Sequence, residues 1–322
     1  MILIAGPWVS SAIKNQFNLV AGAIGSGATG ENFYEPEDIP DPENGTAFAV
    51  YSEDDHSLMF YKRRGVPHLG DMFNYRRVTA VYTGFETMVK YSTDGVPWAP
   101  VKSQIESVTV IDGGIAPRSM CKWFVDLINL KTCDLMRLDT SKVEDMTSTF
   151  AYCQSLTSID LSSFDTSNVK DMTTMFSNCT SLKSLDISNF DTSKVSQMTG
   201  MFQQCKSLSS LDLSSFRTSN VKNMGWMFNH CESLTSVNLS GFDTANVTSM
   251  RTMFQGCHSL KSLDLSNFDT SSVTDMSFMF TTCRSIMSLD LSSFDTGKVS
   301  TFRSMFRNDE SLKTLEMPNA VT

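Results

Sequence analysis

The sequence predicts an α/β repeat solenoid, with one short strand and one short helix per coil, preceded by a β-rich N-terminal capping domain. Two observations predict the solenoid. Leucines recur in an L-x-x-L-x-L-x-x-F pattern that is followed by apolar residues at helical spacing. Cysteines recur every 26 residues, as Cys153, Cys179, Cys205, Cys231, Cys257 and Cys283. A third observation predicts the capping domain, because residues 47–116 lack the repeat and contain short runs typical of strands.

The chain before the repeats divides into three predicted segments. Residues 1–30 are apolar and glycine-rich, and we expect them to dock into a larger assembly. Residues 31–46 are acidic and rich in proline, which favours a stiff, extended linker. Residues 47–116 form the capping domain, in which AFAVYS and SLMFYKRR predict a hairpin and SVTVID a further strand. Residues 117–322 then form the solenoid of about eight coils.

One repeat, residues 155–180, shows the pattern of the rest. Its strand part places Leu156, Ile159, Leu161 and Phe164 toward the core. Its second part is predicted to be a helix, because its apolar residues fall on one face of a 3.6-residue period: Val169, Met172, Met175, Phe176 and Cys179. Such a coil cannot fold alone, so stacking on its neighbours must stabilise it.

A short Asp-Thr-Ser turn joins the two parts of the repeat. It occurs at Asp165 and recurs at Asp191, Asp243, Asp269 and Asp295. Its oxygen atoms are expected to cap the free amides at the helix start. Arg217 replaces the aspartate in one coil and reverses the charge there, which the sequence does not explain.

Composition excludes several classes of partner. The 322 residues carry a formal net charge of −9, which disfavours binding to nucleic acid or to an anionic membrane surface. No run of 18 apolar residues could form a transmembrane helix, and the apolar start lacks the basic residues of a signal peptide. We therefore expect neither nucleic acid nor a transmembrane segment, and we find no convincing signal peptide or wall anchor.

The sequence offers no catalytic, metal or cofactor site. The cysteines lack the close pairs of zinc sites, and helix packing at about 8 to 10 Å would hold equivalent cysteines too far apart for disulfides. We expect them to form a reduced, buried column. Gly25 to Gly30 match a dinucleotide motif, but a proline-rich segment follows instead of a helix. We expect no enzyme, although an enzyme with a hidden site remains an alternative.

The outward side of the predicted strands carries the candidate binding residues. Aspartates alternate with the buried leucines, and serines flank them. Neighbouring carboxylates about 4.8 Å apart repel by about 0.8 kcal/mol even in water, which favours cationic or hydroxyl-rich ligands. Alternatively, this face is only solvated and resists aggregation. The candidate ligand-binding residues are Asp134, Asp160, Asp186, Asp212, Asp264 and Asp290, with Ser158, Ser184, Ser210, Ser236 and Ser262.

The unit L-x-S-L-D-L-S-x-F-D-T-S-x-V-x-x-M-x-x-M-F-x-x-C-x-S resembles the repeat of BspA-like leucine-rich-repeat surface proteins and covers about Met120 to Met317. The resemblance implies a leucine-rich-repeat-like fold and a non-catalytic adhesin that recognises a protein or glycan on a host or cell surface. We therefore expect an extracellular or surface location. The alternative is a phage or injection-particle tail fibre, spike or decoration protein that carries the array for receptor binding. An intracellular partner-binding protein is a third hypothesis.

Overall fold

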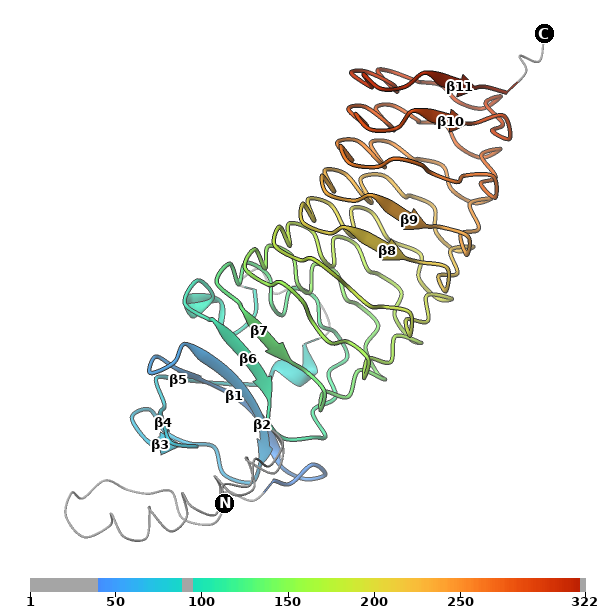
Figure 1. Ribbon diagram of the computed structural model, residues 1–322. Coiled ribbons are helices and arrows are strands. Elements are labelled where there is room, and N and C mark those ends of the chain that lie inside the picture. The colour runs from blue at the N-terminus through green and yellow to red at the C-terminus, as the bar shows by residue number, and fades with distance from the viewer. Residues whose placement is uncertain (1–39, 89–94, 319–322) are drawn as a thin grey trace, which may run out of the picture.

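The computed structural model describes residues 40–88 and 95–318 as an elongated stack of coils with a β-rich region at one end (Figure 1). The predicted docking segment, residues 1–30, and most of the predicted linker lie outside the described residues. The repeat solenoid is thus present. The limits predicted for the four segments of the chain remain predictions.

The first part of the chain forms a five-stranded sheet in the order β5-β1-β2-β6-β7. AFAVYS and SLMFYKRR make the antiparallel hairpin β1–β2, whereas β2, β6 and β7 are parallel. The bounds are β1 Thr46–Ser52, β2 Ser57–Arg63, β5 Ala80–Thr83, β6 Ser107–Val110 and β7 Thr132–Asp134. Outside this sheet lie β3 (Met72–Phe73), β4 (Arg76–Arg77) and two 3₁₀ turns, η1 (Phe85–Thr87) and η2 (Ala99–Val101).

The sheet joins the solenoid without a break. β6 pairs with β7, the strand of the first coil, and Val108 lies opposite Cys133. Phe60 of β2 packs against Trp98 and Trp123, with ring centroids 5.2 and 5.8 Å away, and the Trp98 indole donates to the Trp123 carbonyl. The side chains on this side of the sheet therefore belong to the same hydrophobic core as the coils. The sheet covers the first edge of the stack.

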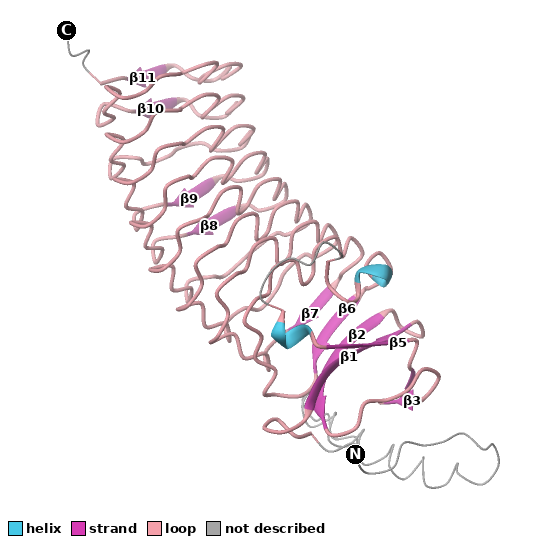
Figure 2. Cartoon of the chain, turned by 180° about the vertical axis from the view of Figure 1, so that it is seen from behind, coloured by secondary structure: helices cyan, strands magenta, loops and turns pink. Residues whose placement is uncertain are grey.

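The predicted helices are wrong. In the described residues, helix occurs only as η1 and η2, both before the first coil, and the second part of each coil is a series of turns (Figure 2). Thr174 and Asn178 have φ of 52° and 61°, left-handed values that break an α-helix, and equivalent positions in the other coils share them. Because the apolar residues of these turns still face the core, their spacing imitates that of an amphipathic helix.

Hydrogen bonds between coils take the place of those within a helix. The amides of Met172, Thr174 and Phe176 each donate to a carbonyl of the next coil, at 2.9 Å. The amides between them close local turns; Met175, for example, donates to the Met172 carbonyl. Hydrogen-bonded parallel chains lie about 4.8 Å apart, so the coils are closer together than packed helices would be. The sequence predicts that equivalent cysteines of neighbouring coils are as far apart as packed helices, and this prediction is therefore also wrong.

The strand parts of the coils pair in register but not continuously. Strands β8 (Ser210–Asp212) and β9 (Ser236–Asn238) pair, as do β10 (Ser288–Asp290) and β11 (Thr314–Glu316). Within the described chain, the equivalent segments at 158–160, 184–186 and 262–264 do not form strands. The prediction of one strand in every coil thus holds in part.

Columns of identical side chains fill the core. Phenylalanines stack from Phe124 to Phe306, with successive ring centroids 5.4 to 6.0 Å apart. The methionine columns beside them are buried as well. Each of the six repeated cysteines is buried, and its thiol donates to a phenylalanine carbonyl; that of Cys179 lies 3.1 Å from the Phe150 carbonyl. Burial raises the pKa of Cys179 to about 12, so this thiol is unreactive.

The Asp-Thr-Ser turns do not cap helices. Their threonines form a buried column from Thr140 to Thr270, in which each hydroxyl bonds to the backbone of the next coil. The Thr192 hydroxyl, for example, donates to the Arg217 carbonyl at 3.1 Å and accepts from the Arg217 amide at 2.8 Å. The Asp191 carboxylate instead accepts from the Ser193 amide. The threonine column bonds only to backbone atoms of residue 217, so the side chain at that position can be an exposed arginine.

The last coil carries Asp309 at the position of a repeated cysteine. Its carboxylate accepts from the Cys283 amide at 2.8 Å, and partial burial raises its pKa to about 6. The folded state therefore holds the proton more tightly than the unfolded state, whose pKa is near 3.8. The contribution of Asp309 to the free energy of unfolding is fully present below the unfolded pKa. It is lost as the pH rises toward 6.

We expect Asp309→Asn to raise the melting temperature at pH 8, because its amide oxygen still accepts from Cys283 without a buried charge. The gain should disappear below about pH 4, where the carboxyl group is protonated in both states. Thermal melts of both proteins from pH 3 to 8 check this prediction. A gain that is independent of pH would contradict it.

Candidate functional site

The candidate site is the outward face of the strand segments. The predicted aspartates and serines lie there, and all are exposed. We call Asp134, Asp160, Asp186, Asp212, Asn238, Asp264 and Asp290 the acidic column, and Ser158, Ser184, Ser210, Ser236 and Ser262 the first serine column. Ser210 lies opposite Ser236, and Asp212 lies opposite Asn238. Where the coils pair, the structure thus brings equivalent side chains next to one another.

The carboxylates of the acidic column are held by the chain that follows them. The Asp186 carboxylate accepts from the Ser188 amide at 3.1 Å and from the Ser188 hydroxyl at 2.8 Å. These bonds lower the pKa of Asp186, although the neighbouring Asp160 charge opposes the shift. The pKa values of Asp160, Asp212, Asp264 and Asp290 are lowered by equivalent bonds. Hydrogen bonding thus outweighs repulsion at these five aspartates, whose carboxylates stay ionised at neutral pH.

The two serine columns differ in function. The serines that follow the aspartates, such as Ser188 and Ser214, donate to the carboxylates and so stabilise the turn. In contrast, none of the five hydroxyls of the first serine column bonds to another group in the described chain. They are free to bind a ligand beside ionised carboxylates.

A depression interrupts this face between two coils. It has a volume of about 380 Å³ and is lined by Ser158 to Ser162 and by Ser184, Asp186, Ser188 and Asn189. Among the described residues, the Lys183 amide makes the one backbone hydrogen bond between these strand segments, to the Thr157 carbonyl. The Asn189 amide group also joins them, donating to the Leu161 and Phe164 carbonyls. The depression therefore lies where the strand ladder is open.

Sequence reasoning missed two features of this site. It did not identify Asn189, which bridges the coils beside the depression, or the partial exposure of Ile159, which lines the depression. Asparagine replaces serine at two positions of its column, Asn189 and Asn267, and both side chains bridge coils. The replacement of serine by asparagine at these two positions was the signal in the sequence that these residues differ in role.

Within the described residues, no group of three or more histidine, cysteine, aspartate or glutamate side chains could hold a metal ion. No helix in that part of the chain is long and apolar enough to cross a membrane. The glycine motif at 25–30 lies outside the described residues.

The stacked coils, with leucine-based strand segments and outward side chains in register, define a repeat solenoid of the leucine-rich-repeat type. The chain belongs to the family described as "Mycoplasma protein of unknown function, DUF285", whose model matches residues 118–240 and 226–316. The resemblance to BspA-like leucine-rich-repeat proteins is thereby confirmed. The family description assigns no function.

Solved structures similar to this chain are leucine-rich-repeat proteins. The T. pallidum leucine-rich-repeat protein TpLRR is 16% identical, with a TM-score of 0.37, over 70% of this chain and 92% of that one. A leucine-rich-repeat protein from Bacteroides ovatus is 14% identical, with a TM-score of 0.24, over 88% and 89% of the two chains. No curated protein matches the chain in sequence.

Proposed function

We propose that this protein is a non-catalytic, adhesin-like binding protein that attaches to a protein or glycan on a host or cell surface. The observation that carries the proposal is the exposed row of ionised carboxylates beside free serine hydroxyls. Such groups bind cationic side chains and hydroxyl-rich ligands. The proposed ligand-binding residues are those of the acidic and first serine columns.

Repetition would supply the strength of binding. Apart from the coil that carries Asn238, each of these coils offers one carboxylate and one hydroxyl, and contacts of this kind on an exposed surface contribute about 0 to 1 kcal/mol each. A ligand that spans several coils combines such contacts. Once one contact has formed, the remaining ligand groups are held near the next coils at a high effective concentration. The depression beside Asp160 and Asp186 adds the partly exposed side chain of Ile159, which suits the apolar face of a sugar ring or a short side chain.

We propose an extracellular or surface location for the protein. Mass spectrometry of culture supernatant, cell envelope, cytoplasm and purified virus-like particles tests this. Detection in the supernatant or envelope supports the adhesin, and enrichment in the particles supports the tail-fibre or decoration alternative. Detection in soluble cytoplasm alone would contradict both.

The acidic column gives a direct test of binding. We expect Asp186→Asn, Asp212→Asn and Asp264→Asn together to weaken binding at least tenfold on those cells and arrayed glycans that the unmodified protein binds. The melting temperature should stay nearly the same, because asparagine keeps the turn acceptor at these exposed positions. Flow cytometry, glycan arrays and thermal melts provide the measurements.

The matched control removes the same charge from another column. Asp165→Asn, Asp191→Asn and Asp269→Asn together alter exposed carboxylates that hold the Asp-Thr-Ser turns. This control should bind like the unmodified protein. Undiminished binding by the first triple variant would assign recognition to the capping domain or to the face formed by the turns.

A further inference from the structure

We propose that the turn side of the later coils carries a second binding surface, which docks an extended acidic segment of a partner protein. We call it the arginine–aromatic patch and define it as Trp226, Arg251, Phe278 and Arg303. It lies in the second part of the repeat, whereas the acidic column lies in the strand part. It is independent of the function proposed for the strand face.

The residues of the patch depart from the repeat. Arg251 and Arg303 occupy a position that holds small residues in the other coils: Thr147, Thr173, Thr199, Gly225 and Ser277. Trp226 and Phe278 occupy the next position, where other coils carry Lys122, Ser148, Thr174, Gly200, Thr252 and Ser304. Folding of a coil thus requires neither an arginine nor an aromatic ring there.

The aromatic residues also sit at an unfavourable backbone position. Trp226 and Phe278 have φ of 65° and 59°, in the left-handed region where bulky side chains are uncommon. Gly200 adopts the same conformation in an earlier coil, with φ of 63° and no strain. Trp226 nevertheless leaves 38% of its surface exposed, so burial in the core does not account for it.

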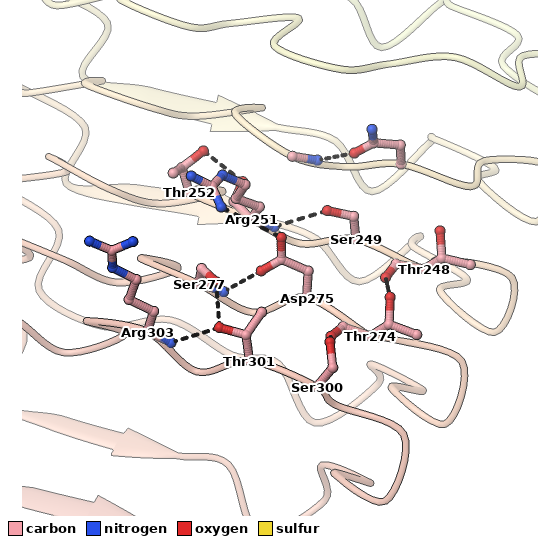
Figure 3. A network of polar contacts seen from close by, with 12 residues as sticks. Thr248, Ser249, Arg251, Thr252, Thr274, Asp275, Ser277, Ser300, Thr301 and Arg303 are labelled. Carbon is pink, nitrogen blue, oxygen red and sulfur yellow. Dashed lines mark hydrogen bonds and ion pairs between the residues drawn. The ribbon is translucent and has the colours of Figure 1, made fainter.

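Phe278 positions both guanidinium groups. The Arg251 guanidinium lies 5.3 Å from the centre of the Phe278 ring, and the Arg303 guanidinium lies 5.7 Å from it. Figure 3 shows the two arginine side chains at the same edge of the polar network that joins these coils. Contacts with one ring restrict both side chains before a ligand arrives, which reduces the entropy lost on binding.

The arginines have spare capacity for an anion. Arg251 lies 3.7 Å from the half-buried Asp275 carboxylate, a loose ion pair that leaves other guanidinium donors free. Arg303 has no carboxylate partner within the described chain. Two restrained guanidinium groups on a protein of net charge −9 therefore form a local cationic site.

The spacing of the arginines selects the ligand. Because they are two coils apart, their backbones lie about 10 Å from each other. On a peptide in the extended polyproline II conformation, carboxylates three residues apart lie on the same face and are separated by about 9 Å. Each guanidinium can hold a carboxylate through two parallel hydrogen bonds, and exposed tryptophan and arginine are typical of protein-binding hot spots. Two arginines are too few for a long polyanion, which the acidic column would also repel.

The test measures binding of a labelled peptide to the full chain. The probe is a fluorescein-labelled peptide containing Glu-Tyr-Ala-Glu, and fluorescence anisotropy measures its dissociation constant. We expect Arg251→Ser with Arg303→Ser to raise that constant at least tenfold. Serine occupies the equivalent position at 277, so the variant should fold, and a thermal melt verifies this.

Matched controls separate the patch from charge in general. Arg217→Ser with Arg284→Ser removes two other exposed arginines and should leave the dissociation constant unchanged. The same peptide with glutamine in place of glutamate should bind at least tenfold more weakly. Equal binding by the patch variant, equal binding of the glutamine peptide, or tighter binding of a heparin fragment than of the acidic peptide would overturn the proposal.

Discussion

Phe202→Ala should destabilise the protein by about 3 to 5 kcal/mol, the cost of emptying a buried phenylalanine site. Phe202 is fully buried, and its ring stacks between Phe176 and Phe228 at centroid distances of 6.0 and 5.7 Å. The coils above and below are fixed by the backbone ladder, so they cannot close the cavity without breaking hydrogen bonds. Urea unfolding followed by circular dichroism measures the loss.

The control for this variant is Phe302→Ala. Phe302 leaves 41% of its surface exposed, so its truncation should cost far less. A loss below about 1 kcal/mol for Phe202→Ala would contradict the close packing of the phenylalanine column.

Thr218→Val should cost about 2 to 4 kcal/mol, although the two side chains have nearly the same shape. The buried Thr218 hydroxyl donates to the Asp243 carbonyl at 2.7 Å and accepts from the Asp243 amide at 2.9 Å. Valine would leave both backbone groups without a partner inside the stack, and each unpaired group costs about 1 to 3 kcal/mol. The same urea unfolding experiment measures this loss.

Thr235→Val is the matched control for Thr218→Val. The Thr235 hydroxyl also bonds between coils, to the Ser209 carbonyl at 2.9 Å, but this bond is exposed and water can replace it. We expect a loss below about 0.5 kcal/mol for the control. Equal losses for the two variants would show that the threonine column does not hold the coils together.

The repeat and the outward face were predictable from the sequence because both depend on local alternation. Leu211 and Leu213 alternate with Asp212, and a three-residue strand segment places them on opposite sides whatever the neighbouring coils do. The period of 26 then aligns the equivalent residues of successive coils. The exposed acidic and serine columns follow from these two facts alone.

The helices were wrongly predicted because two backbones can satisfy one apolar pattern. Met172, Met175 and Phe176 face the core in the turns as they would in a helix, so their spacing could not distinguish the two structures. The deciding residues were those with left-handed φ, and most of them, such as Thr174 and Asn178, are not glycine. Gly200, Gly225 and Gly256, inside three predicted helices, were the local signals against a helix.

The contacts between coils were not predictable residue by residue. The role of Thr192 depends on the backbone of Arg217, and the position of Asn189 depends on carbonyls of the preceding coil. Both contacts join residues about one repeat apart. Sequence reasoning could identify these columns but not the atoms to which they bond.

The central claim is that a hydrogen-bonded ladder sets the spacing of the coils and hence of the acidic column. The most direct test is the distance between spin labels at Ser158→Cys and Ser288→Cys, which occupy the same position of the repeat five coils apart. The half-buried Cys121 and Cys133 are replaced by serine, because the six buried thiols should not react. Ladder spacing predicts a distance near 24 Å, from about 4.8 Å per coil. A distance of about 40 to 50 Å, the spacing of helix-packed coils, would contradict the account.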